Sequence, residues 1–352
     1  MRVLTVVGAR PQFIKAAPVS RILRSTHQEF LLHTGQHYDE AMSDLFFRQL
    51  DIPAPDRNLE VGSGPHGAQT GAMLTGIESV ALEYRPDWIL VYGDTNSTLA
   101  GALAGAKLHV PVAHVEAGLR SYDRRMPEEV NRVVADHVAT LLLCPTQTAV
   151  ANLAREGITE GVHLTGDVMF DAFEQNLDVA GRSVEILSEL KLRAGEYALL
   201  TAHRAENVDD PARLRSILAG VAASGMLTVF PVHPRTRKAL GAVAGNVKTV
   251  DPVGYLEMLV LEKNAAVIVT DSGGVQKEAF FAGRPCVTVR SATEWTETVD
   301  AGWNVLVGTD ATAIAERMRD FRPSTERPNV FGDGNAAARV VDALAAATVP
   351  SA

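Results

Sequence analysis

Short apolar runs alternate with helical patterns along the whole chain, and this alternation restarts once near the middle. Residues 3–7 are rich in β-branched side chains and precede helical spacing over 13–24; residues 88–92 and 97–108 repeat the succession. Continuous apolar runs of this length are typical of parallel strands buried on both faces, which helices must connect. The pattern therefore predicts an α/β fold with parallel, doubly wound sheets.

The restart after residue 167 predicts a second half of the same kind. The chain has 352 residues, more than one hydrophobic core usually organises. We therefore expect two Rossmann-like domains, 1–168 and 169–334, and an Ala-rich last helix at about 335–350. The further expected strands are 29–34, 110–116, 141–145, 197–201, 227–232, 247–250, 267–270 and 286–289; the further expected helices are one beginning at residue 38, 211–223 and 275–282.

Composition narrows the functional classes. The formal net charge of −9 argues against nucleic-acid partners and anionic membrane surfaces, and no apolar run is long enough to cross a membrane. Cys144 and Cys286 are far apart and lie in no metal-binding spacing, so we interpret them as reduced thiols of a cytoplasmic protein. No paired spacing of His and carboxylate residues recurs in the sequence, so we expect no metal site.

Polar clusters follow five of the expected strands. In open parallel sheets, ligands bind beyond the carboxyl ends of the strands. We therefore expect one cleft, shared by both domains. The clusters are residues 8–11, 93–98, 116–120, 203–207 and 271–274.

The segment 271–278 predicts a seat for a pyrophosphate. Ser272, Gly273 and Gly274 separate a strand from a helix, and the free N–H groups at a helix N-terminus favour an anion. Glu278 lies about one turn further, where a carboxylate can accept hydrogen bonds from ribose hydroxyls. The alternative is that Ser272 caps the helix and the glycines make a tight turn. The segment is neither a P-loop nor a GxGxxG fingerprint, so it supports neither ATP nor NAD.

Charged side chains in the other clusters are candidates for proton transfer and phosphate binding. Arg10 and Lys15, in and after the first turn, can neutralise a diphosphate or simply face solvent. Asp94 and Glu116 end neighbouring strands, where gathered carboxylates can move protons.

Glu128 and Arg132 are four residues apart on one helix face and can pair, either in the site or as a surface ion pair. His203 and His233 each follow a strand and can bind phosphate, although a lone histidine is more often structural.

The polar clusters, taken in their order along the chain, resemble those of the non-hydrolysing UDP-N-acetylglucosamine 2-epimerases. The resemblance covers nearly the whole chain. It rests on Gly8-Ala9-Arg10-Pro11-Gln12, Thr34-Gly35-Gln36-His37, Gly93-Asp94-Thr95-Asn96-Ser97-Thr98, His114-Val115-Glu116-Ala117-Gly118-Leu119-Arg120, Pro127-Glu128-Glu129-Val130-Asn131-Arg132, Thr201-Ala202-His203-Arg204, Glu206-Asn207, residues 271–278 and Phe331-Gly332-Asp333-Gly334.

The resemblance implies a fold like the GT-B glycosyltransferases, in which the last helix returns to the N-terminal domain. It implies elimination of UDP from UDP-GlcNAc, re-addition to give UDP-ManNAc, no cofactor, and a homodimer. The acid/base carboxylates would be Asp94, Glu116 and Glu128, with Arg132 near them and His203 at the phosphate side. Arg10, Lys15, His233, Ser272, Gly273, Gly274 and Glu278 would bind the nucleotide.

One departure from the family bears on the substrate. Many members have Thr-Glu-Arg-Pro-Glu where this chain has Thr293-Glu294-Trp295-Thr296-Glu297, so Trp295 replaces an arginine for which Arg290 is a partial substitute. This variant, with the segments 251–256 and 275–281, resembles a subgroup that epimerises UDP-2,3-diacetamido-2,3-dideoxyglucuronate. A uronate would need a cation, and Arg120, Arg124 and Arg125 are candidates. A GT-B glycosyltransferase and a non-catalytic UDP-sugar-binding protein are further alternatives.

Overall fold

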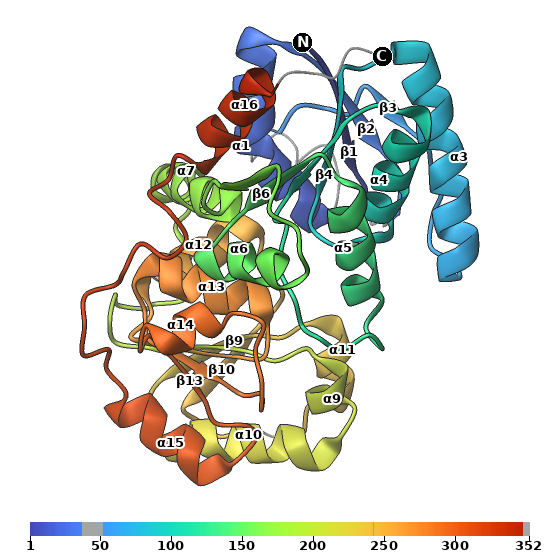
Figure 1. The fold of residues 1–352 in the computed structure, drawn as a ribbon. Helices are drawn as coiled ribbons and strands as arrows, with labels where there is room; N and C mark the ends of the chain where they lie inside the picture. Colours follow the sequence, from blue (N-terminus) through green and yellow to red (C-terminus); the bar gives the residue numbers. More distant parts are fainter. Residues whose placement is uncertain (37–51, 242, 348–352) are drawn as a thin grey trace. The chain divides into compact units, whose positions relative to one another are not determined.

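The computed structural model describes residues 1–36, 52–241 and 243–347. They divide into two compact units, shown as a ribbon in Figure 1. The N-terminal unit comprises Met1–Ala172 together with the segment from Asn329 onward, and the C-terminal unit is Phe173–Pro328.

The described part of the N-terminal unit contains a seven-stranded sheet in the order β3-β2-β1-β4-β5-β6-β7. All of its strand pairs are parallel. The strands are β1 (Arg2–Val7), β2 (Gln28–His33), β3 (Arg57–Asn58), β4 (Trp88–Tyr92), β5 (Val112–Val115), β6 (Leu141–Cys144) and β7 (Val162–Leu164). The order reverses at β1, so that β1 and β4 form the switch point at which ligands bind in such sheets.

Small residues let the helix α4 lie close to this sheet. A Cβ on Gly101 would be 2.7 Å from a methyl carbon of Val91 on β4, and one on Gly105 would be 2.4 Å from Val112 on β5. The other helices described in this unit are α1 (Arg10–Thr26), α3 (His66–Tyr84), α5 (Pro127–Val138), α6 (Gln147–Arg155), α16 (Ala336–Ala346) and the first turn of α7 (Val168–Ser183); α4 is Asn96–Leu108.

The end of the described chain is fixed to the N-terminal unit. The helix α16 packs on α1, and the two lie side by side in Figure 1. Its first two amides, those of Ala336 and Ala337, donate to the carboxylate of Asp171 at 3.2 and 2.8 Å. A carboxylate favours the N-terminus of a helix, so Asp171 stabilises the junction between α7 and α16.

The C-terminal unit repeats this architecture with a six-stranded parallel sheet, β10-β9-β8-β11-β12-β13. Its order reverses at β8, so that β8 and β11 form a second switch point. The strands described are β8 (Ala198–Thr201), β9 (Thr228–Pro231), β10 (Val247–Val250), β11 (Val267–Thr270), β12 (Cys286–Thr288) and β13 (Asn304–Leu306); the helices are α8 (Ile186–Glu189), α9 (Ala205–Val208), α10 (Pro211–Ala223), α11 (Pro234–Ala239), α12 (Tyr255–Asn264), α13 (Gly273–Ala282), α14 (Thr296–Asp300) and α15 (Ala311–Asp320).

The α/β class and the two parallel sheets predicted from the sequence are confirmed. The helix expected to begin at residue 38 lies outside the described residues. Among the helices of the described residues, none combines the length and the apolar character that a membrane span requires.

Candidate functional site

Gln12 joins the two strand ends at the switch point of the N-terminal unit. Its side-chain oxygen accepts from the amide of Gly8 at 2.8 Å, and its side-chain nitrogen donates to the carbonyl of Tyr92 at 2.7 Å. The turn after β1 is thereby fixed against the end of β4. Arg10 opens α1 at this turn and is partly exposed.

Two of the predicted site residues form an ion pair beside this turn. Lys15, on α1, pairs with Glu116, which directly follows β5. The backbone of Glu116 has a φ of 71°, a left-handed conformation that costs free energy for a residue with a side chain. A Cβ on Gly93 would lie 3.1 Å from Oε2 of Glu116 and 3.3 Å from Nζ of Lys15. The ion pair therefore packs on Gly93, at the end of β4.

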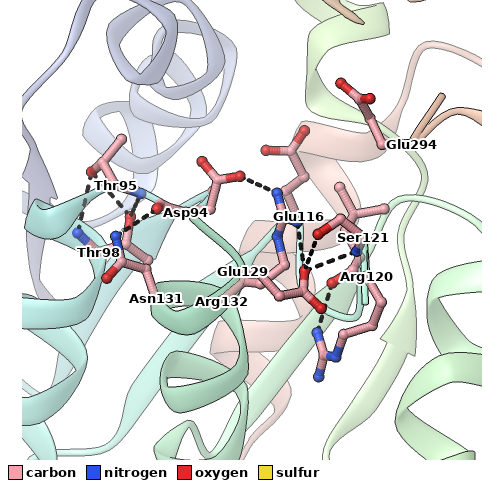
Figure 2. Close-up of polar contacts among 12 residues, drawn as sticks. Asp94, Thr95, Thr98, Glu116, Arg120, Ser121, Glu129, Asn131, Arg132 and Glu294 are labelled. Atoms are coloured by element: carbon pink, nitrogen blue, oxygen red, sulfur yellow. Dashed lines mark hydrogen bonds and ion pairs between the residues drawn. The ribbon is translucent and has the colours of Figure 1, made fainter. Parts of the chain in front are cut away.

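Arg132 connects a second predicted carboxylate to the helix α5 (Figure 2). Its guanidinium pairs with Asp94, which is partly exposed, and donates to Glu129 at 2.9 Å. Asn131 donates to the backbone carbonyl of Asp94 at 2.9 Å. Both the side chain and the backbone of Asp94 are thus positioned by consecutive residues of α5.

The predicted pairing of Glu128 with Arg132 is wrong. Glu128 is exposed, and its side chain makes no hydrogen bond or ion pair within the described part of the chain. Its neighbour Glu129 is buried instead and accepts from the amides of Ser121 and Tyr122 at 2.8 and 3.0 Å. The i,i+3 spacing directs Glu129, rather than Glu128, toward Arg132.

A buried network underlies the Gly93–Asp94 turn, and its members had no predicted role in the site beyond Arg120. His114 contacts Asp136 through Nδ1 and the carbonyl of Gly93 through Nε2, both at 2.7 Å. Burial opposes ionisation of Asp136, but the charges of His114 and Arg120 outweigh it and lower the pKa of its carboxyl. Through the contact of His114 with Gly93, this network stabilises the turn from which Asp94 projects.

The same network bears on the arginines proposed for a uronate. Arg120 is buried and forms ion pairs with Asp136 at 2.6 Å and with Glu156 at 2.7 Å. Its positive charge is therefore already paired with carboxylates of the protein. Arg125 is exposed and pairs with Asp123 at 2.8 Å, while Arg124 is also exposed. Arg120 is therefore the wrong candidate, because the buried Asp136 and the partly exposed Glu156 already neutralise it.

Asp271 organises the switch point of the C-terminal unit. It is fully buried at the end of β11, and its carboxylate accepts from the amides of His203 and Arg204, at the end of β8, at about 3.1 and 3.0 Å. The rings of His203 and His233 lie 5.9 Å apart. Desolvation lowers the pKa of His203, and the charges of His233 and Arg204 lower it further against the opposing effect of Asp271. The structure thus brings the two predicted histidines together.

The helix α13 begins at the predicted pyrophosphate seat. Ser272 occupies the N-cap position, but its side chain makes no capping hydrogen bond. Gly273 is buried and Gly274 exposed; a Cβ on Gly273 would lie 2.2 Å from Oε1 of Glu294. A carboxylate therefore lies against the first turn of this helix, where an anion is favoured.

Two arginines hold that carboxylate. Arg290 donates to Glu294 at 3.0 Å, and Arg204 lies 3.6 Å from it. Burial opposes ionisation, but the charges of Arg290 and Arg204 lower the pKa of Glu294. The sequence suggested Arg290 as a partial substitute for the arginine that Trp295 replaces. In the structure, the guanidinium of Arg290 pairs with Glu294 instead.

The last predicted ligand of the nucleotide, Glu278, is partly buried on α13. No group of three or more His, Cys, Asp or Glu side chains with the arrangement of a metal site occurs among the described residues.

Comparison with known proteins identifies the family. Residues 21–345 match the UDP-N-acetylglucosamine 2-epimerase family. A UDP-N-acetylglucosamine 2-epimerase homolog of Methanococcus maripaludis is 51% identical over 98% of this chain and 99% of the relative. The UDP-2,3-diacetamido-2,3-dideoxy-D-glucuronate 2-epimerase of Pseudomonas aeruginosa is 47% identical over 98% of this chain and 99% of its own.

A solved structure agrees with these relatives. The UDP-GlcNAc 2-epimerase of Methanocaldococcus jannaschii, in complex with UDP-GlcNAc and UDP, superimposes with a TM-score of 0.87 at 43% identity, covering 99% of this chain and 100% of that one. The chain therefore belongs to the UDP-N-acetylglucosamine 2-epimerase family of isomerases.

Proposed function

We propose that the protein interconverts UDP-GlcNAc and UDP-ManNAc. The observation that carries this proposal is the placement of two acids, Asp94 and Glu116, at the ends of the neighbouring strands β4 and β5, each paired with a cation. The complex of the Methanocaldococcus enzyme with UDP-GlcNAc and UDP supports the same substrate.

The reaction is an elimination followed by re-addition. A carboxylate of the site removes the C2 proton as the C1–O bond breaks, and the electron pair of that bond leaves with UDP. The bound 2-acetamidoglucal then receives a proton at C2 on the opposite face, and UDP adds again at C1. Asp94, Glu116 and Glu128 are our candidates for these proton transfers, and Arg132 positions Asp94.

Charge that develops on the departing diphosphate needs preorganised donors. We assign this role to Arg10, Lys15, His203, His233 and the first turn of α13 at Ser272, Gly273 and Gly274. Loss of one such donor raises a barrier by roughly 2.7–4 kcal/mol in comparable sites. We assign Glu278 to the ribose hydroxyls. No cofactor enters this scheme, and we propose a homodimer in the cytoplasm, as the family resemblance implies.

A second substrate is favoured by one specific observation. The Pseudomonas relative, which is 47% identical to this chain, is a UDP-2,3-diacetamido-2,3-dideoxy-D-glucuronate 2-epimerase. The Trp295 variant resembles the subgroup with that activity. The same elimination would apply, with Arg124 or Arg125 as the remaining candidates for the uronate.

Proton NMR of UDP-GlcNAc with the protein in D2O tests the proposal. We expect UDP-ManNAc carrying deuterium at C2, without any added cofactor. The variant E116Q, which removes the charge paired with Lys15, should abolish the exchange. No exchange with UDP-GlcNAc, but exchange with the diacetamidoglucuronate, would move the proposal to the second substrate. Accumulation of UDP with free or transferred sugar would overturn it in favour of a hydrolase or transferase.

A further inference from the structure

Three buried amide side chains form a hydrogen-bonded series in the N-terminal unit. They are Gln69 on α3, Asn96 at the start of α4 and Asn131 on α5, with exposed fractions of 7%, 5% and 5%. The side-chain nitrogen of Asn96 donates to Oε1 of Gln69 at 2.8 Å, and that of Asn131 donates to Oδ1 of Asn96 at 3.1 Å. The series therefore connects three helices that are separated in the sequence.

The Gln69 end of the series is fixed to the backbone. The side-chain nitrogen of Gln69 donates to the carbonyls of Gly62 and Gln36 at 2.7 and 3.3 Å. The second N–H of Asn96 points to Nδ1 of His66, which lies 3.1 Å away and accepts when the ring proton is on Nε2. The nitrogens of Gln69 and Asn96 thus each have two acceptors, one for each N–H group.

The other end of the series is the backbone of Asp94. Asn131 gives its second N–H to the carbonyl of Asp94 at 2.9 Å, as Figure 2 shows. If the amide of Asn96 were reversed, its nitrogen would face the nitrogen of Asn131, and its oxygen would face the oxygen of Gln69. Buried amides arranged in this way would lose their hydrogen bonds, so each neighbour determines the orientation of the next.

The turn that carries Asp94 is held at two consecutive carbonyls. The carbonyl of Gly93 contacts Nε2 of His114 at 2.7 Å, and the carbonyl of Asp94 accepts from Asn131. With both peptide groups fixed, the direction in which the side chain of Asp94 leaves the backbone is fixed as well. Arg132 then pairs with the carboxylate at the end of that side chain.

We propose that Asn96 is a positioning residue for the isomerase reaction: it orients Asn131, which fixes the carbonyl of Asp94 and thereby aims the Asp94 carboxylate at the substrate. This inference rests on the proposed function, which makes Asp94 a candidate for proton transfer. A misplacement of about 1 Å in a reacting group can cost about 100-fold in rate, so a side chain that sets the backbone of Asp94 matters for turnover. The alternative is that the series only holds α3, α4 and α5 together.

The variant N96A removes the acceptor of Asn131 and tests the proposal through two separate quantities. In the D2O exchange assay with UDP-GlcNAc, we expect kcat to fall about 100-fold. The affinity for UDP, measured by calorimetry, should stay within about twofold, because we assign the nucleotide to other residues. A loss of UDP affinity as large as the loss of kcat would indicate general disruption of the fold and overturn the proposal.

The matched control is N246A, in the C-terminal unit. Asn246 donates to the carbonyls of Ala222 and Met226, both at 3.1 Å, so its replacement also removes two hydrogen bonds of a buried amide. It directly precedes β10 and therefore lies at the amino end of the sheet, away from the strand ends where ligands bind. N246A should lower stability and leave kcat unchanged. Equal losses of kcat in N96A and N246A would overturn the proposal.

A double-mutant cycle with D94N tests whether Asn96 acts through Asp94. Residues that act as a unit are not additive, so N96A should lower the residual exchange of D94N by less than about twofold. The same 100-fold loss in both backgrounds would overturn the inference. If N96A does not fold, Q69M replaces it in the cycle. Q69M keeps the volume but removes the acceptor of Asn96, and we expect a loss of kcat of about tenfold.

Crystal structures of N96A or Q69M give a readout that needs no activity. We expect the carbonyl of Asp94 to turn away from Asn131 and its carboxylate to leave Arg132. An unchanged Asp94 in the variant would overturn the inference, also where D94N has no measurable exchange. If the unaltered protein exchanges neither UDP-GlcNAc nor the diacetamidoglucuronate, the proposed function fails, and the position of Asp94 in the variant structure still decides the role of Asn96.

Discussion

The ammonium group of Lys277 lies 4.0 Å from the centroid of the Trp295 ring. Both residues are buried, with exposed fractions of 4% and 6%. A buried cation needs compensation, and the face of a tryptophan ring provides it. Lys277, on α13, and Trp295, in the family's arginine position, therefore form one coupled feature.

Restoring the arginine at this position should destabilise the protein. W295R places a second cation beside Lys277 and removes the ring face, so we expect the free energy of unfolding to fall by about 2–3 kcal/mol in urea titrations. Adding K277M should recover most of this loss, because only one buried charge then remains. W295F is the matched control and should cost less, since it keeps an aromatic face. A W295R variant as stable as the unaltered protein, or no recovery with K277M, would contradict the coupling.

Glu128 and Glu129 are adjacent in sequence but differ in surroundings, which makes them a matched pair for substitution. Glu129 is buried and accepts from Ser121, Tyr122 and Arg132, so E129Q should lower the free energy of unfolding by roughly 1–3 kcal/mol. Exposed Glu128 has no such partners within the described chain, and E128Q should change stability by less than about 0.5 kcal/mol.

E128Q should have a large effect on turnover, although its effect on stability is small. If Glu128 transfers a proton, its neutral substitute should lower kcat by at least about 100-fold at unchanged stability. Full activity of E128Q in the D2O exchange assay would remove Glu128 from the mechanism and leave Asp94 and Glu116 as the proton-transfer groups.

The sequence predicted the fold and the polar strand ends because both depend on local patterns. Apolar runs located β1, β4, β8 and β11, and the clusters after them meet at the two switch points. The short edge strands β3, β7 and β13 were missed, since two or three residues give no periodicity. The long helix α3 was missed as well.

The partners of charged side chains depended on tertiary contacts that spacing cannot supply. An i,i+4 interval suggested Glu128 for Arg132, whereas the fold of the 121–122 turn makes Glu129 its partner. Arg120 is neutralised by Asp136 and by Glu156, 36 residues away in sequence.

The Asp136 network should make the stability of the N-terminal unit sensitive to acid. The pKa of Asp136 is lowered in the folded state, so its contribution is complete above the unfolded value of about 3.9. It is lost as the pH falls below that value and through the lower pKa of the folded state. At pH 7, D136N leaves Arg120 and His114 without their buried anion and should cost about 3–5 kcal/mol in urea unfolding. D123N, at the exposed pair with Arg125, is the control and should leave the midpoint unchanged. Equal effects of the two variants would contradict the assigned importance of the buried network.

His203 should make diphosphate binding depend on pH, with a direction set by its surroundings. Its pKa is lowered by desolvation and by the charges of His233 and Arg204, so the ring is neutral at pH 7 and becomes a cation only in more acidic solution. A ligand of fixed charge, the methyl ester of the UDP β-phosphate, should therefore bind more tightly as the pH falls from 7.5 to 5.5. H203Q should flatten this profile. H233Q should move its midpoint upward, because the substitution removes a neighbour that disfavours the charged ring 5.9 Å away. A profile that H203Q leaves intact would show that another group carries the proton, and would remove His203 from the diphosphate side of the proposed mechanism.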